Sequence, residues 1–197
     1  MCELRQQKRE MREAFLERRR NISQEDRVLW DEKIANILLG SISYRFCDVL
    51  LAYASNKLEV STEKIIDKAL ENKKIVVCPI SNPNDNTMSF AEIKSRGELS
   101  PGEYNILEPP KENRNWLDIL NLGDRLLAIC IVPCLSYDFY GYRIGYGKGY
   151  YDRFLSSFEG TKIGLCYSDF KADRLPRGKY DMKLDVIITE KGVTVIK

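Results

Sequence analysis

The sequence of 197 residues contains no histidine, and this absence removes several kinds of chemistry. Without histidine there can be no Ser-His-Asp triad, no Cys-His pair and no imidazole acting as a general base. Any catalysis must therefore use carboxylates, lysine, arginine, tyrosine, cysteine, backbone amides or a metal ion held by oxygen atoms.

Cysteine is present six times, but no Cys-x-x-Cys pair occurs, so the sequence shows no ligand set for a structural zinc ion. Cys47, Cys78, Cys130 and Cys166 lie in or beside apolar runs, which predicts buried, reduced thiols. The charged N-terminal segment has no apolar stretch typical of a signal peptide. Together these features favour a cytoplasmic protein.

Strong net charge and long apolar runs are also missing. The net charge is only +2, so bulk electrostatics do not indicate a nucleic-acid partner. No apolar run approaches the length that spans a membrane. We expect one domain over residues 1–197, acting as a monomer without nucleic-acid or membrane partners.

The apolar pattern changes from helical to alternating along the chain. Helices are predicted over residues 3–20, 23–39, 61–72 and 149–158, with Ser23 and Ser61 as N-caps. Strands are predicted over residues 47–53, 75–80, 126–132, 163–167, 185–188 and 193–196. Residues 81–125 are mixed, with a short strand near an edge predicted over residues 88–93. The alternation predicts a largely parallel sheet with helices on both faces.

The most informative segment is 141–153, Gly-Tyr-Arg-Ile-Gly-Tyr-Gly-Lys-Gly-Tyr-Tyr-Asp-Arg. It follows the clearest strand and leads into a helix, and ligands of open α/β sheets bind beyond the carboxyl ends of strands. Gly145, Gly147 and Gly149 permit positive φ and close approach of the backbone to a ligand. The helix N-terminus adds unpaired amide donors and a partial positive charge. This combination predicts a phosphate-binding loop.

Charged side chains in the same segment strengthen this prediction. Arg143 and Lys148 supply full positive charges, and Asp152 is placed to hold Mg²⁺ between phosphate oxygens. The segment matches neither the dinucleotide fingerprint nor the P-loop, because Lys148 is followed by Gly149 rather than by serine or threonine. The alternative is a flexible turn in which Asp152 only caps the helix. The coincidence of glycines, cations, tyrosines and a carboxylate favours the anion site.

The N-terminal helix carries a second group of cations. Lys8 and Arg12 are four residues apart and share one face, where a bound polyphosphate could lie between them. Arg5, Arg9 and the run 18–20 are also basic, with glutamates interleaved. From these residues alone, a solvated basic face is the favoured interpretation.

The glycine segment 141–152 and the preceding Val132–Asp138 resemble the 5-formyltetrahydrofolate cyclo-ligase family, also called methenyltetrahydrofolate synthetases. The resemblance covers nearly the whole chain, through the segments Lys8–Arg12, Glu59–Thr62, Ile163–Tyr167 and Tyr180–Asp185. It implies a three-layer α/β/α sandwich, Rossmann-like, with a mostly parallel central sheet and N-terminal helices packed on it.

The resemblance also implies a reaction. In that family, 5-formyltetrahydrofolate is cyclised to 5,10-methenyltetrahydrofolate while ATP is converted to ADP and phosphate. Phosphorylation of the formyl oxygen creates a leaving group, and N10 of the same folate then attacks, so proximity supplies much of the rate. ATP and a reduced folate are the implied partners, Mg²⁺ is the implied cofactor, and no histidine is required.

Site residues follow from the same resemblance, position by position. The implied ATP contacts are Lys8, Arg12, Arg143, Ile144, Gly145, Tyr146, Gly147, Lys148, Gly149, Tyr150 and Tyr151. The implied folate contacts are Ala54, Glu59, Tyr146, Gly147, Lys148, Gly149 and Tyr150. The implied metal ligands are Asp152 and Asp181, and the expected catalytic residues are Arg143, Lys148 and Asp152.

The folate side of this assignment carries more alternatives than the ATP side. Glu59 could be an ordinary loop carboxylate, and Asp181 a residue of a solvated turn. Ser61, Cys134 and Tyr180 depart from the usual family residues, which are acidic, glycine and histidine. None of these departures removes a residue assigned to phosphate or metal.

Two other functions are compatible with the pattern. One is a non-catalytic relative that binds nucleotide or RNA, and the other is an ATP-dependent ligase acting on another pterin or amide. A binding module is expected to lose catalytic groups or to add a domain. The cations and the carboxylate of the glycine segment are all present, which favours the enzyme.

Overall fold

A computed structural model describes residues 2–102, 105–110 and 126–197. Its main strands are β1 (Val49–Leu51), β2 (Ile75–Asn82), β3 (Thr87–Ile93), β6 (Ala128–Pro133), β9 (Thr161–Leu165), β11 (Val186–Thr189) and β12 (Gly192–Val195). They form one seven-stranded sheet in the order β12-β11-β9-β6-β1-β2-β3. The five inner strands run parallel, and the two edge strands are antiparallel to their neighbours. The expected mostly parallel sheet is confirmed.

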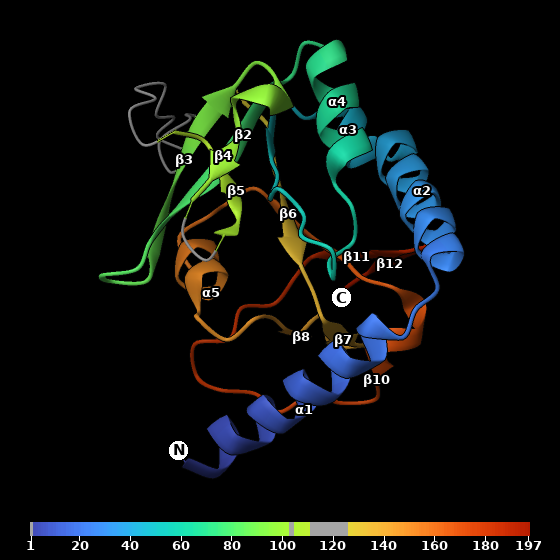
Figure 1. Cartoon of the computed structure of the whole chain (residues 1–197), viewed down its shortest axis with the longest axis vertical. Coiled ribbons are helices and arrows are strands. Elements are labelled where there is room, and N and C mark those ends of the chain that lie inside the picture. The colour runs from blue at the N-terminus through green and yellow to red at the C-terminus, as the bar shows by residue number, and fades with distance from the viewer. Residues whose placement is uncertain (1, 103–104, 111–125) are drawn as a thin grey trace.

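Helices cover both faces of this sheet. They are α1 (Cys2–Arg20), α2 (Gln24–Gly40), α3 (Ile42–Phe46), α4 (Glu63–Glu71) and α5 (Tyr150–Leu155). Figure 1 shows α2, α3 and α4 on one side of the sheet and α5 on the other, which gives the expected three layers. In the same view α1 crosses the end of the sheet toward which β6 points.

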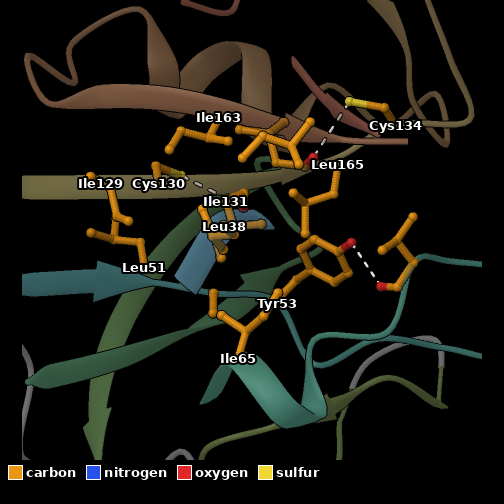
Figure 2. Packing of buried hydrophobic residues seen from close by; sticks show 14 of the residues in the cluster. Leu38, Leu51, Tyr53, Ile65, Ile129, Cys130, Ile131, Cys134, Ile163 and Leu165 are labelled. Atoms are coloured by element: carbon orange, nitrogen blue, oxygen red, sulfur yellow. Dashed lines mark hydrogen bonds between the residues drawn. The ribbon is translucent and has the colours of Figure 1, made fainter. Parts of the chain in front are cut away.

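The core forms where the apolar runs of the sequence become parallel strands. Parallel strands are covered on both faces, so continuous apolar runs are expected in them. Residues 129–132 of β6 are each at most 2% exposed. Figure 2 shows Ile131 beside Leu38 of α2, and the same buried cluster includes Leu51 of β1 and Ile65 of α4. The central strands are thus held to the helices of one face by apolar packing.

The five cysteines whose side chains are described are all free and buried. The prediction of buried thiols is therefore confirmed for its four residues, and Cys134 joins them. Burial raises the pKa of the Cys130 thiol to about 12. At neutral pH such a thiol stays protonated, so these side chains fill space and are poor nucleophiles.

Several element boundaries differ from expectation. Ser23 caps α2 as predicted, since its hydroxyl accepts a hydrogen bond from the amide of Asp26 at 3.0 Å. The predicted cap of α4 is wrong: Thr62, not Ser61, occupies the N-cap position, and its hydroxyl donates to the Tyr53 carbonyl at 2.5 Å. The short helix α3 was not foreseen; it begins directly after Ser41.

Smaller elements complete the structure. The strands β10 (Lys171–Ala172), β7 (Ser136–Asp138) and β8 (Arg143–Ile144) form a second sheet, and β4 (Ser100–Pro101) pairs with β5 (Leu107–Glu108). The 3-10 turns η1 (Arg96–Glu98) and η4 (Ser168–Phe170) lie in loops of the described part of the chain. The stretch 81–125 predicted as mixed lies partly outside the described residues. Among the helices that are described, none has the length and apolar character needed to cross a membrane.

Candidate active site

The carboxyl ends of the central strands bring together three loops. Residues 52–62 follow β1, residues 134–149 follow β6, and residues 166–185 follow β9. The chain moves from β1 to β2 on one side and returns to β6 on the other side of β1, so the strand order reverses between β1 and β6. Ligands of open α/β sheets bind at such a switch point. Every predicted site residue outside α1 and the first turns of α5 lies on these loops or on β8.

Helix α1 places two of its cations in this site. The Nε of Arg12 donates to the carbonyl of Gly145 at 2.8 Å. Lys8 forms an ion pair with Asp181, and the two side chains are only 18% and 22% exposed. The interpretation of α1 as a solvated basic face is therefore wrong for Lys8 and Arg12, and also for Arg19, which is fully buried.

The glycine loop has the conformation expected at two of its three central glycines. Gly147 has a φ of +94°, and a Cβ there would lie 2.8 Å from Cζ of Arg12. Gly149 has a φ of +76° and stands at the N-cap of α5. Gly145 has no positive φ and faces open space, so a side chain is tolerated there. Of these three central glycines, 147 and 149 are therefore the ones whose backbone requires glycine.

Arg143 lies beneath the loop rather than on its surface. Its side chain is 5% exposed, and its Nη2 is 3.0 Å from Oδ1 of Asp152. Its Nη1 donates to the carbonyl of Met182 at 3.2 Å, and the Met182 amide donates to Asp152 at 3.2 Å. Arg143 thus fixes the position of Asp152, while Lys148 is the exposed cation of the loop.

Asp152 and Asp181 can be tested as the predicted magnesium ligands. Asp181 is paired with Lys8, and its neighbour Met182 contacts Asp152, so the two carboxylates belong to one part of the site. Within the described residues, no group of three or more metal-ligating side chains comes together. Mg²⁺ bound to phosphates needs only one or two protein carboxylates, because phosphate and water oxygens complete its shell. The two carboxylates fit that manner of binding.

Glu59 lies on the loop after β1, which also carries the buried Ala54. It is half-buried, and its Oε2 accepts a hydrogen bond from the amide of Asn56 at 2.9 Å. Desolvation raises the pKa of this carboxyl group to about 7. The phenol of Tyr146, from the glycine loop, hydrogen-bonds the side chain of Asn56. The glycine loop and the Glu59 loop therefore meet directly.

A cavity of about 460 Å³ lies elsewhere, between α2 and α4. Its walls are mostly charged side chains such as Glu32, Lys64 and Arg96, and it contains none of the predicted site residues. The strand-end site is the better candidate because the glycine loop, the α1 cations and the carboxylates meet there.

One residue of the site was not singled out from the sequence. Arg19 is 0% exposed and contacts the loops after β1, β6 and β9. A signal for it was present, since Arg19 lies seven residues after Arg12 and eleven after Lys8, close to two and three helical turns. These three cations therefore share one face of α1.

Comparison with known proteins agrees with the fold and with the resemblance seen in the sequence. The profile of the 5-formyltetrahydrofolate cyclo-ligase family matches residues 4–190. The NMR structure of Aquifex aeolicus 5,10-methenyltetrahydrofolate synthetase is 32% identical, with a TM-score of 0.80 over 96% of this chain and 93% of that chain. A Caenorhabditis elegans protein named a probable 5-formyltetrahydrofolate cyclo-ligase is 27% identical over 100% of this chain and 98% of its own.

A second solved structure supports the fold. The 5,10-methenyltetrahydrofolate synthetase from Mycoplasma pneumoniae is 24% identical, with a TM-score of 0.72 over 93% of this chain and 98% of that chain. The fold, the match across nearly the whole chain and the glycine loop lead to one assignment. The chain belongs to the 5-formyltetrahydrofolate cyclo-ligase family of enzymes.

Proposed function

We propose that this enzyme uses ATP to convert 5-formyltetrahydrofolate into 5,10-methenyltetrahydrofolate, with release of ADP and phosphate. One observation carries the proposal. At the switch point of the sheet, the α1 cations and the glycine loop form a cationic surface that directly adjoins the Glu59 loop. A site with these two halves suits a phosphate donor and a polar, ring-shaped acceptor.

The ATP half consists of α1 and the glycine loop. Lys8, Arg12 and Lys148 supply positive charge, and the backbone of residues 143–151 approaches the phosphates closely because Gly147 and Gly149 have positive φ. Fixed charges of this kind stabilise the charge that develops during phosphoryl transfer. Mg²⁺, held by Asp152 with Asp181 beside it, would neutralise phosphate charge when bound with ATP.

The folate half consists of the loop after β1 together with residues 146–150. The Glu59 carboxylate can accept hydrogen bonds from the amino and ring N–H groups of a pterin. Because the pKa of Glu59 is about 7, this acceptor is only partly ionised at neutral pH. Ala54 lies on the same loop and is the other folate contact that we propose there.

The chemistry follows from the formyl group on N5, which is amide-like, so its carbon is a poor electrophile until its oxygen is phosphorylated. Its oxygen attacks the γ-phosphorus, the bond to the bridging oxygen breaks, and ADP leaves. N10 then attacks the activated formyl carbon and loses its proton, and the carbon–oxygen bond breaks to release phosphate. Both reacting nitrogens belong to one molecule, so positioning supplies much of the rate and no histidine is needed.

The test is direct. Protein, ATP, magnesium and 5-formyltetrahydrofolate are mixed, and the methenyl product is followed by its ultraviolet absorbance. We expect product that depends on ATP and on the metal, and about one ADP per methenyl group. Absence of ATP-dependent product would overturn the proposal. Turnover of a different formylated pterin or amide, with 5-formyltetrahydrofolate inert, would favour the alternative ligase.

A further inference from the structure

Arg19 has the most extensive set of loop contacts of the α1 cations described above. Its side chain is 0% exposed. Its Nη1 donates to the carbonyl of Leu58 at 2.7 Å. Its Nη2 donates to the carbonyl of Cys134 at 2.5 Å and lies 3.3 Å from Sγ of Cys166. Each acceptor belongs to a different loop, so one guanidinium joins all three loops of the site.

The positions of these acceptors connect Arg19 to both halves of the site. Leu58 directly precedes Glu59, and Cys134 begins the loop that leads to the glycine segment. The guanidinium also stacks on aromatic rings beyond β9, with Cζ 5.0 Å from the ring centroid of Tyr167 and 4.9 Å from that of Phe170. A planar group held on its edges and its face has little freedom to move.

A charge buried to this extent is costly unless it is well compensated. Among the residues that the structure describes, no carboxylate forms an ion pair with Arg19, and carbonyl oxygens and aromatic rings take that role. The acidic group of the site that responds to this charge is Glu59: burial raises its pKa, and Arg19 partly opposes that rise. Burying this charge without a paired carboxylate lowers the stability of the fold, and it fixes the positions of the three loops.

We propose that Arg19 is a positioning residue that fixes the Glu59 loop and the start of the glycine loop relative to each other, so that folate and ATP face each other. The proposal rests on the proposed function for the identity of the two ligands. Because Lys8, Arg12 and Arg19 share one face of α1, the helix that contributes cations to the ATP half also holds the folate half.

The first test compares three variants by calorimetric binding of 5-formyltetrahydrofolate. Arg19→Gln removes the charge and part of the hydrogen-bonding fork, Arg19→Lys keeps the charge alone, and Arg20→Gln is the control. Arg20 is exposed and, within the described part of the chain, forms an ion pair with Glu17 on its own helix and with no other carboxylate. We expect R19Q to weaken folate binding about tenfold or more, because several charge-assisted hydrogen bonds are lost. R19K should recover part of this loss of affinity, and R20Q should bind folate as tightly as wild type.

The second test is the pH dependence of folate binding, which a purely structural role would not move. The titratable and charged groups around Glu59 are Tyr53, Tyr146, Tyr151 and Arg19. Loss of the positive charge should raise the pKa of Glu59 further. In R19Q the pH at which folate binding rises should therefore increase by roughly half a pH unit or more. In R19K and R20Q folate binding should keep the pH dependence of wild type.

These measurements separate the outcomes. If R19Q binds folate as tightly as wild type and with the same pH dependence, the proposal is overturned. If R19Q does not fold, R19K decides, since wild-type affinity in R19K would show that the fork is not needed. Binding is measured without turnover, so absence of ATP-dependent product from wild type counts against the proposed function, whereas equal folate binding by wild type and R19Q counts against the role of Arg19.

Discussion

Strand β6 and the glycine loop that follows it are adjacent in sequence and are stabilised in different ways. In the strand, residues 129–132 are at most 2% exposed and pack against α2 and α4 through apolar contacts. In the loop, Tyr146 is 37% exposed, and the main fixed points are polar contacts to Arg12 and to residue 182. The strand is held by the apolar packing of most of its side chains, while the loop is held by a few polar contacts.

This difference separates stability from activity. Apolar burial supplies most of the free energy of folding, so the strand should govern stability. The loop uses buried charge, which costs free energy, and glycines whose positive φ most other residues rarely adopt, so we expect it to serve ligand binding rather than stability. Substitutions in the two regions should therefore affect different measurements.

The largest expected effect is on stability, from Ile131→Ala in β6. Ile131 is 0% exposed, and removing its side chain leaves a cavity, so we expect a loss of about 2–5 kcal/mol in the free energy of unfolding. Urea denaturation measures this loss. Turnover per folded molecule should stay close to wild type. A large loss of turnover in the fully folded variant would contradict the claim that β6 governs stability and the glycine loop governs activity.

The next effect is on turnover, from Asp152→Asn in the loop. Asp152 is the proposed magnesium ligand and is held by Arg143. We expect kcat to fall by about 100-fold or more, the scale of removing one electrostatic contact from a transition state. A circular-dichroism spectrum like that of wild type shows that the fold is kept. Wild-type kcat in Asp152→Asn would show that Asp152 is not a magnesium ligand.

A smaller effect is expected from Gly147→Ala, with Gly40→Ala, at the end of α2 and outside the site, as its control. At position 147 the alanine must adopt an unfavourable positive φ and its Cβ lies 2.8 Å from Cζ of Arg12, whereas at position 40 the new Cβ meets open space. We expect KM for ATP to rise about tenfold in the first variant and to change little in the second. Equal values for the two variants would contradict the loop geometry.

The smallest effect is on pH dependence. The pKa of Glu59 is raised to about 7 by burial, so the carboxylate becomes ionised as the pH rises through that value. We expect folate binding to tighten about tenfold between roughly pH 6 and 8, and Glu59→Gln to bind independently of pH. Titration calorimetry at several pH values checks this. A flat wild-type profile would exclude ionised Glu59 as the pterin acceptor.

The same group makes the opposite contribution to stability. Its pKa is higher in the folded than in the unfolded protein, so between about pH 4.5 and 7 the folded state binds the extra proton. The stability contributed by Glu59 therefore decreases as the pH rises through this window, and it should be restored in Glu59→Gln. Stability and folate binding should change in opposite directions with pH.

Much of the fold was predictable because its information is local. Apolar runs identified the strands that became β1, β2, β6 and β11, and Ser23 identified the start of α2. The parallel order followed from their alternation with helices. The cap of α4 was mistaken because Thr62 uses its hydroxyl to bond Tyr53 across the loop, a contact that local propensity does not contain.

The site was predictable only in part. The glycine loop has a distinctive sequence, and the structure confirms the positive φ of Gly147 and Gly149. Helical spacing places Arg19 on the face of Lys8 and Arg12, but its full burial depends on carbonyl groups as far away as Cys134, which the spacing does not contain. The ion pair of Lys8 with Asp181 likewise joins opposite ends of the chain. The monomeric state, the magnesium ion and the absence of nucleic-acid or membrane partners stay predictions.

The central claim is that the site transfers the γ-phosphoryl group of ATP to the formyl oxygen of the folate. The most direct measurement uses 5-formyltetrahydrofolate labelled with oxygen-18 in its formyl group, with product phosphate analysed by mass spectrometry. Because the carbon–oxygen bond of the formyl group breaks only after that oxygen is attached to phosphorus, the label should appear in inorganic phosphate, one atom per turnover. Methenyl product formed with unlabelled phosphate would contradict the claim.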